Sequence, residues 1–191
     1  MSHIVIRSIL AASAGVFLET KYAPELGLHV VGTGGLPKAF GATPMVLTCM
    51  SFWVLMHGFM VVGGARSKYS ELAVKDGEKD VPERYSYPNL YAQGTSKHAK
   101  AFNCVQRSHQ HIFETFPQLC LLSMVGAVHY PIAAALGALT YSVGRIVLST
   151  SYAGAEGDAA KRYESALAPL MWYGFIFSTV VAMASSVSFV L

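Results

Sequence analysis

Long apolar stretches separated by short polar segments dominate the chain. A helix that spans a bilayer needs about 20 predominantly apolar residues, and four stretches are long enough. The pattern therefore predicts membrane spans at residues 44–64, 102–129, 132–152 and 165–191. A fifth apolar stretch, from Ile4 to Leu18, is only about 15 residues long, which favours a surface or re-entrant segment. The predicted fold class is an all-α, integral membrane four-helix bundle.

The polar segments divide the chain into parts. Residues 1–43 are predicted to be an N-terminal extension, because the GTGG sequence at Gly32 to Gly35, followed by Pro37, breaks any helix that enters it. Residues 44–191 are predicted to form the transmembrane domain. Within that domain, residues 67–100 combine alternating charges with scattered turn residues, a pattern typical of a solvated polar loop.

Composition supports a membrane protein. The chain is 53% hydrophobic and only 13% charged, whereas about a quarter of the residues in soluble domains are charged. The net charge of +3 is small, and the basic residues form no arm with interleaved aromatics, so a nucleic-acid partner is not expected. Cys49, Cys104 and Cys120 have no CxxC spacing, which favours neither a disulfide framework nor a zinc site.

The distribution of basic residues predicts an orientation in the membrane. Seven of the fourteen Lys and Arg residues lie between Arg66 and Lys100, and two more, Lys161 and Arg162, lie between the third and fourth spans. The hairpin between the second and third spans carries no Lys or Arg. Because cytosolic loops are enriched in basic residues, the two charged loops are expected on the cytosolic or matrix-like side, with both termini opposite.

The second predicted span begins with a polar stripe. Asn103, Arg107, Gln110 and Glu114 are spaced four, three and four residues apart, so they share one helix face, and His111 lies beside them. Charges at membrane depth are costly unless they face a site, a partner or a wet cavity, which makes this stripe a candidate site. Two other interpretations stay open. Glu114 can form an ion pair that only fixes helix packing, and the arginine can snorkel to the interface.

The third span repeats the pattern, with a charged residue, Arg145, inside an otherwise apolar segment. One helical face of this span combines Tyr141, Arg145, Leu148, Ser149 and Tyr152. Two cationic helix faces that open toward the same side predict a small anion as the ligand. A buried ion pair between Arg145 and Glu114 is again the alternative.

The histidines do not predict a metal site. His109 and His111 are two residues apart and point to different faces of a helix, and no HExxH or ExxH arrangement supplies further ligands. His57, within the first span, is predicted to make an interhelical hydrogen bond.

Several motifs resemble those of one known family, the membrane-associated proteins in eicosanoid and glutathione metabolism (MAPEG). The strongest is FNCVQRSHQ at Phe102 to Gln110, with Glu114 and Pro117 after it. The likeness continues in ARSKY at 65–69, YPNLY at 87–91, VGRIVLSTSYAG at 143–154 and KR at 161–162. It extends from residue 44 to about residue 190, and within the family it is strongest to the type 3 microsomal glutathione S-transferases.

The resemblance implies a homotrimer in the endoplasmic reticulum membrane that binds glutathione, its co-substrate, between neighbouring subunits. It implies conjugation of glutathione to a lipophilic electrophile, or reduction of a lipid hydroperoxide, without a metal. Residue by residue, the resemblance assigns these roles: Arg66 and Arg107 hold the glutathione carboxylates, His109 makes a polar contact, Glu114 engages the amino group, Tyr152 lines the site and Arg162 stabilises the catalytic thiolate. His111 is expected to contact glutathione as well, although it does not match the family's residue at that position.

Three positions depart from the family pattern. His111 replaces a common asparagine, Leu148 replaces a tyrosine, and Ser67 replaces an arginine or lysine. These changes affect the site more than the fold. Two non-enzymatic hypotheses therefore stay open. One is a structural subunit that docks among unlike subunits of a mitochondrial membrane complex, and the other is a scaffold that binds lipid in the crevice between subunits.

Overall fold

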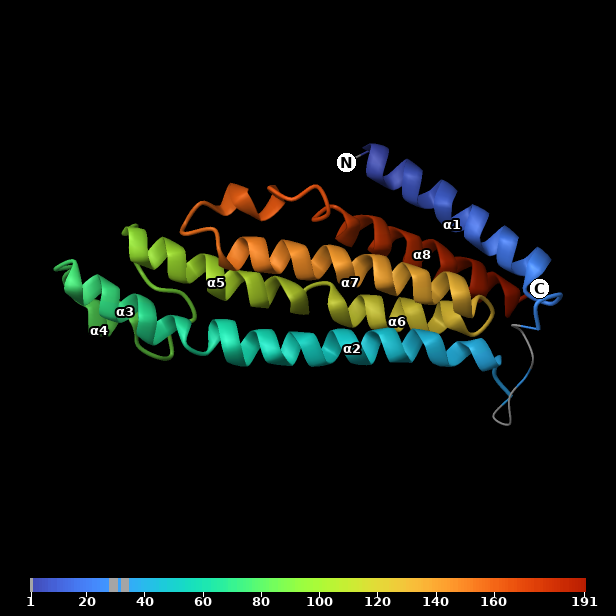
Figure 1. Ribbon diagram of the computed structural model, residues 1–191, viewed down its shortest axis with the longest axis horizontal. Helices are drawn as coiled ribbons and strands as arrows, with labels where there is room; N and C mark the ends of the chain where they lie inside the picture. The colour runs from blue at the N-terminus through green and yellow to red at the C-terminus, as the bar shows by residue number, and fades with distance from the viewer. Residues whose placement is uncertain (1, 28–30, 32–34) are drawn as a thin grey trace. The chain divides into compact units, whose positions relative to one another are not determined.

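The computed structural model describes residues 2–27, 31 and 35–191, and the elements formed there are helical (Figure 1). Eight α-helices follow one another in this described part: α1 (Ser2–Tyr22), α2 (Ala42–His57), α3 (Ala65–Lys75), α4 (Val81–Tyr85), α5 (Lys97–Phe113), α6 (Phe116–Ala127), α7 (Pro131–Ala153) and α8 (Leu170–Ser188). Two 3-10 helices, η1 (Lys38–Gly41) and η3 (Ala159–Tyr163), and a π-helical turn, η2 (Gly58–Val62), complete them. The predicted all-α fold class is confirmed.

Five helical segments in the described part of the chain are long and apolar enough to cross a membrane: His3–Tyr22, Lys38–Lys75, Lys97–His129, Pro131–Ala153 and Leu170–Ser188. The predicted N-terminal segment of about 15 residues, Ile4 to Leu18, is therefore too short. Helix α1 has 21 residues, because it continues past Leu18 through Glu19 and Lys21. Residues 32–34 of the predicted helix break lie outside the described residues.

The second predicted span lies within the helical segment Lys97–His129, which consists of two consecutive α-helices. Helix α5 ends at Phe113 and α6 begins at Phe116. Pro117 lies in the first turn of α6, where its missing N–H costs little, whereas inside a continuous helix it would remove a backbone hydrogen bond. The third predicted span corresponds to α7. The fourth predicted span contains α8, which begins at Leu170, directly after Pro169.

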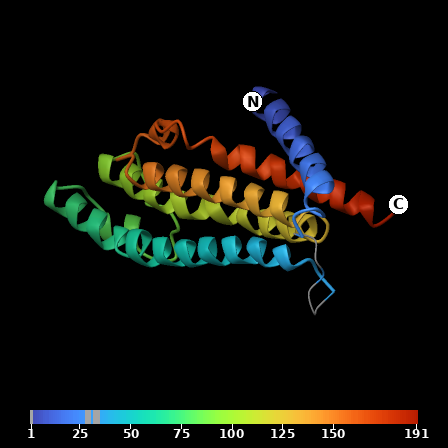
Figure 2. The ribbon, with the colours of Figure 1, turned by 45° about the vertical axis from the view of Figure 1, so that its right-hand side comes forward.

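The helices group into two compact units. The first comprises residues up to Ser51, Thr115–Arg145 and Pro169–Leu191. In it α1 and α6 both pack against α8. Helix α1 runs beside α8 in Figure 1 and meets it at an angle in Figure 2. The core of this unit is mainly small: Ala12, Ala127, Ala133, Ala134 and Val181 are almost fully buried. Small side chains let membrane helices approach closely, so packing replaces the hydrophobic effect as the stabilising force.

Glu19 connects the N-terminal helix to the start of α7. Its Oε1 accepts a hydrogen bond from Ile132 N at 2.9 Å and its Oε2 accepts one from Ala133 N at 2.8 Å. The first N–H groups of a helix have no partner within the helix and carry the positive end of its dipole. The carboxylate, 7% exposed, therefore satisfies donors that the apolar surroundings would leave unpaired.

We expect Glu19→Gln to destabilise the protein by about 2 to 4 kcal/mol, since it removes the charge from two charge-assisted hydrogen bonds and places an amide N–H against a backbone donor. Thermal unfolding in detergent, followed by circular dichroism, measures the loss. Glu25→Gln, the same change at an exposed glutamate close by, should leave the unfolding temperature unchanged. Equal unfolding temperatures for the two variants would refute the capping role.

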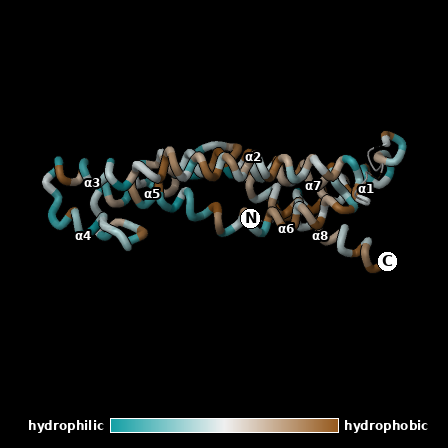
Figure 3. The backbone as a smooth tube through the Cα atoms, turned by 90° about the horizontal axis from the view of Figure 1, so that it is seen from below, coloured by the Kyte–Doolittle hydropathy of each residue, from teal (hydrophilic) through white to brown (hydrophobic). Residues whose placement is uncertain are grey.

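The second unit comprises Phe52–Glu114 and Ile146–Ala168. Here α3 packs against α4 and α5, over a buried cluster of Ala65, Ala73, Val81, Tyr85, Ala92, Ala99, Phe102 and Val105. The prediction of a solvated loop at residues 67–100 is therefore wrong for much of that segment. Its sequence is charged and α3 and α4 are largely hydrophilic (Figure 3), but the inward-facing positions are mostly alanines, which add little to a hydropathy signal.

Candidate functional site

The polar stripe of α5 ends in a bidentate ion pair. Arg107 Nη1 donates to Glu114 Oε1 at 2.5 Å, and Nη2 donates to Oε2 at 3.1 Å. Glu114 caps the C-terminus of α5, so the end of the helix places the carboxylate one turn beyond His111. His111 Nε2 lies 3.8 Å from Glu114 Oε2. The side chains of Arg107 and Glu114 are 39% and 48% exposed. Three of the predicted site residues thus lie together, with the ion pair accessible.

The other two members of the stripe hold a neighbouring segment. Asn103 Oδ1 accepts from Ala92 N at 2.8 Å, and its Nδ2 donates to Ala92 O at 3.0 Å. The Gln110 side chain accepts a hydrogen bond from the Tyr91 hydroxyl. These contacts fasten residues 91 and 92 to α5, next to the ion pair.

Arg66, at the start of α3, is enclosed by aromatic rings and backbone carbonyls. Its guanidinium donates to Tyr85 O and, at 2.8 Å, to Asn89 O. The guanidinium carbon lies 4.3 Å from the Tyr87 ring centroid and 5.0 Å from that of Phe102, within cation–π range. Arg66 therefore organises the segment that follows α4, a contact that its spacing in the sequence did not reveal.

Arg162 and Tyr152 lie next to each other. The guanidinium carbon of Arg162, on η3, is 5.5 Å from the Tyr152 ring centroid and 5.3 Å from that of Tyr163. Asp158 caps η3 by accepting from Ala160 N at 3.0 Å. Two further predicted site residues are thus brought together, with the cation against the face of the tyrosine.

Cys104 belongs to the surroundings of Tyr152. It forms a small buried cluster with Tyr152 and Ala155, and it is 5% exposed. From the sequence, Cys104 was only a cysteine without a partner motif. Its place beside Tyr152 was not predictable, because its neighbour Ala155 is 51 positions away in the chain.

Arg145 is completely buried. Its Nη2 donates to Thr115 Oγ1 at 2.6 Å and its Nε donates to Tyr141 Oη at 3.3 Å, while the two hydroxyls lie 2.6 Å apart. The predicted face of α7 is the buried face of this helix: Tyr141, Arg145, Leu148 and Ser149 are all 0% exposed, and Tyr152 is 7% exposed. Arg145 therefore belongs to a network inside the protein.

His109 stacks on His57. Their ring centroids are 5.7 Å apart, with the planes inclined by 18°. His109 also meets the Phe113 ring edge-on at 5.0 Å. The predicted hydrogen bond of His57 is not formed: among the residues that the structure describes, neither of its ring nitrogens has a partner.

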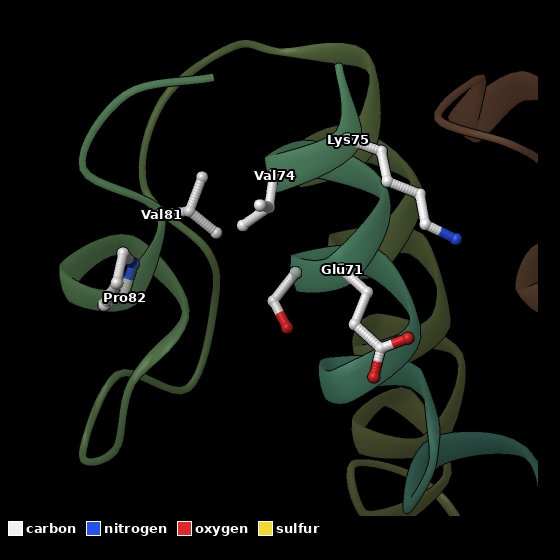
Figure 4. Close-up of a pocket in the computed structure, with 6 residues that line it drawn as sticks. Glu71, Val74, Lys75, Val81 and Pro82 are labelled. Carbon is white, nitrogen blue, oxygen red and sulfur yellow. The ribbon is translucent and has the colours of Figure 1, made fainter. Parts of the chain in front are cut away.

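A surface hollow of about 370 Å³ lies between α3 and the start of α4, lined by Ser70, Glu71, Val74, Lys75, Val81 and Pro82. Val74 and Val81 face each other across it (Figure 4). None of the candidate site residues lines this hollow.

The sequence model of the MAPEG family matches residues 40–187 of the chain. The match contains all the candidate site residues and begins after α1, so α1 and its Glu19 cap lie outside it. No solved structure matches the chain.

Proposed function

Because the chain belongs to the MAPEG family, a family of helical membrane proteins that includes glutathione transferases and peroxidases, we propose that it is a glutathione transferase or peroxidase of the type 3 kind. It conjugates glutathione, through its sulfur atom, to lipophilic electrophiles, or uses glutathione to reduce lipid hydroperoxides. We place it in the endoplasmic reticulum membrane as a homotrimer.

The accessible pair of Arg107 and Glu114 carries this proposal. The γ-glutamyl end of glutathione has one carboxylate and one ammonium on the same carbon, so it presents the same two charges as the pair. On binding, the substrate carboxylate replaces Glu114 on the guanidinium, and the ammonium takes the freed Glu114 carboxylate. Bidentate arginine contacts favour carboxylates, and both side chains are exposed enough to exchange partners.

Arg162 is the proposed activating residue. A thiol with its ordinary pKa of about 8.5 is mostly protonated at neutral pH, and the thiolate is the nucleophile. An arginine does not release its proton at neutral pH. It therefore acts by electrostatic stabilisation of the thiolate, which is strong in a site of reduced dielectric. Tyr152 holds the guanidinium in place by a cation–π contact.

The remaining predicted contacts have supporting roles in the proposal. His109 and His111 contribute polar contacts to the tripeptide. Arg66 positions residues 85–89 through its two backbone hydrogen bonds. Its positive charge attracts the second carboxylate of glutathione. The lipid bilayer supplies the apolar second substrate.

Arg107→Ala is expected to weaken glutathione binding by about 1.5 to 3 kcal/mol, the cost of losing a hydrogen bond to a charged group. Isothermal titration of the detergent-purified protein measures the affinity, and the ultraviolet difference absorbance of the thiolate reports the bound anion. Lys68→Ala removes a positive charge from an exposed position nearby and should bind like the parent protein.

Two results would overturn the proposal. One is an unchanged affinity of Arg107→Ala for glutathione. The other is the absence of both glutathione binding and a thiolate signal in a well-folded parent protein, which would leave the non-catalytic structural subunit as the explanation of the fold.

A further inference from the structure

Two membrane-embedded histidines carry unsatisfied nitrogens. His57 is the last residue of α2, within the candidate span Lys38–Lys75, and is 4% exposed. Among the residues described by the structure, its Nδ1 and Nε2 have no hydrogen-bond partner, nor has the buried Nδ1 of His109. A buried polar group without a partner costs about 1 to 3 kcal/mol. Three such nitrogens in one place therefore require an explanation.

The local backbone is arranged to bring the two rings together. The π-helical turn η2 begins at Gly58, directly after His57, and such turns are frequent at functional sites. A Cβ atom on Gly58 would lie 3.0 Å from Cε1 and 3.1 Å from Nε2 of His109. The His109 ring therefore lies against the bare Cα of Gly58, and a larger residue at this position would push it away.

The surroundings of the pair are apolar, and some of their side chains are exposed on helices expected to face lipid. The Trp53 ring lies 5.0 Å from His57, and Phe113 lies 5.0 Å from His109. Phe113 is 56% exposed and Phe59, next to Gly58, is 71% exposed. His109 is the more accessible histidine and covers His57. A molecule dissolved in the membrane thus meets apolar side chains first and imidazole nitrogens behind them.

We propose that His57 and the buried Nδ1 of His109 bind the polar group of a lipid hydroperoxide, the His109 ring tilting aside to admit it and keeping its Nε2 for the glutathione contact of the proposed function. This inference rests on the proposed function and selects one of its two substrate classes. A neutral imidazole, the form favoured in an apolar environment, has one donor and one acceptor nitrogen. A hydroperoxide both donates and accepts a hydrogen bond, so one molecule between the two rings donates to an acceptor nitrogen of one ring and accepts from the N–H of the other. Epoxides, alkyl halides and simple carbonyl compounds only accept.

Trp53 provides a local reporter of binding. The chain has two tryptophans, so Trp172→Phe leaves Trp53 as the single emitter, with its ring close to His57. In detergent micelles without glutathione, we expect methyl linoleate hydroperoxide to change the Trp53 emission saturably and to bind about tenfold more tightly than methyl linoleate, an effect typical of hydrogen bonds to a buried site.

Substitutions test which side chain is responsible. In the Trp172→Phe protein, His57→Phe keeps a ring but removes both nitrogens and should make the two probes bind equally. His57→Gln, which keeps a donor and an acceptor, should retain part of the preference. His129→Phe is the matched control, because His129 already has a partner, Ser185 Oγ at 3.0 Å, and this variant should keep the full preference.

The outcomes separate this inference from the proposed function. Equal binding of the two probes to the Trp172→Phe protein, or a preference that persists in His57→Phe, would overturn the hydroperoxide site whatever the result with glutathione. A preference that depends on His57 in a protein that does not bind glutathione would support the site and refute the proposed transferase or peroxidase.

Discussion

Replacing Gly174 by alanine is expected to prevent the native packing of α7 against α8. A Cβ at Gly174 would lie 2.2 Å from Tyr141 N and 2.6 Å from Tyr141 Cα. These are backbone atoms, so no rotamer change relieves the clash, and the helices must move apart along their contact. Gly144 shows the reciprocal geometry, with a Cβ position 2.0 Å from Met171 N. We expect a loss of at least about 4 kcal/mol, the range of severe overpacking in a core.

Size-exclusion chromatography and thermal unfolding in detergent measure this effect, and the Gly174→Ala protein is expected to aggregate or to unfold at a much lower temperature. Gly64→Ala is the matched control, since nothing lies within 4 Å of a Cβ there and its φ of −85° suits alanine. A Gly174→Ala protein as stable as Gly64→Ala would show that the two helices do not approach this closely.

Replacing Arg162 by alanine is expected to reduce turnover by about 10² to 10³, the effect of removing one group that stabilises a developing anion, while glutathione affinity changes only a few-fold. In the proposed mechanism the arginine favours the thiolate and not the tripeptide as a whole. The loss should therefore fall on kcat and on the thiolate absorbance. Arg162→Lys should recover part of the rate, because it keeps the positive charge.

Steady-state kinetics with a generic lipophilic electrophile, together with titration of glutathione, separate these effects. Lys161→Ala, the neighbouring cation on the same 3-10 helix and an exposed one, should leave both quantities unchanged. Parallel losses of binding and turnover in Arg162→Ala would assign Arg162 to glutathione binding instead of thiolate stabilisation.

The amino-acid sequence by itself determined the helical class, the presence of helices apolar enough to span a membrane, and the family. Each depends on properties that are local in the chain. Twenty or so consecutive apolar residues form a helix in a bilayer because every backbone N–H and C=O must be satisfied within the segment, whatever the neighbours are. The pairing of Arg107 with Glu114 was likewise one of the readings the sequence allowed, because residues on one helix face are brought together by the helix period.

Only the tertiary structure decided what the remaining polar residues do. In the sequence, the charge of Glu19 suggests the end of a short apolar segment. In the structure, two backbone N–H groups at the N-terminus of α7, over a hundred positions away, donate to its carboxylate, and α1 continues past it. The alanines of the segment 67–100 add little to a hydropathy signal, yet Ala73, Ala92 and Ala99 lie in one buried cluster with Phe102 and Val105 of α5. Arg66 and His57 are similar cases, since their surroundings come from segments distant in the chain. A contact between residues that are distant in the chain forms only when the backbone folds. Composition and residue spacing therefore could not predict the contacts of these residues.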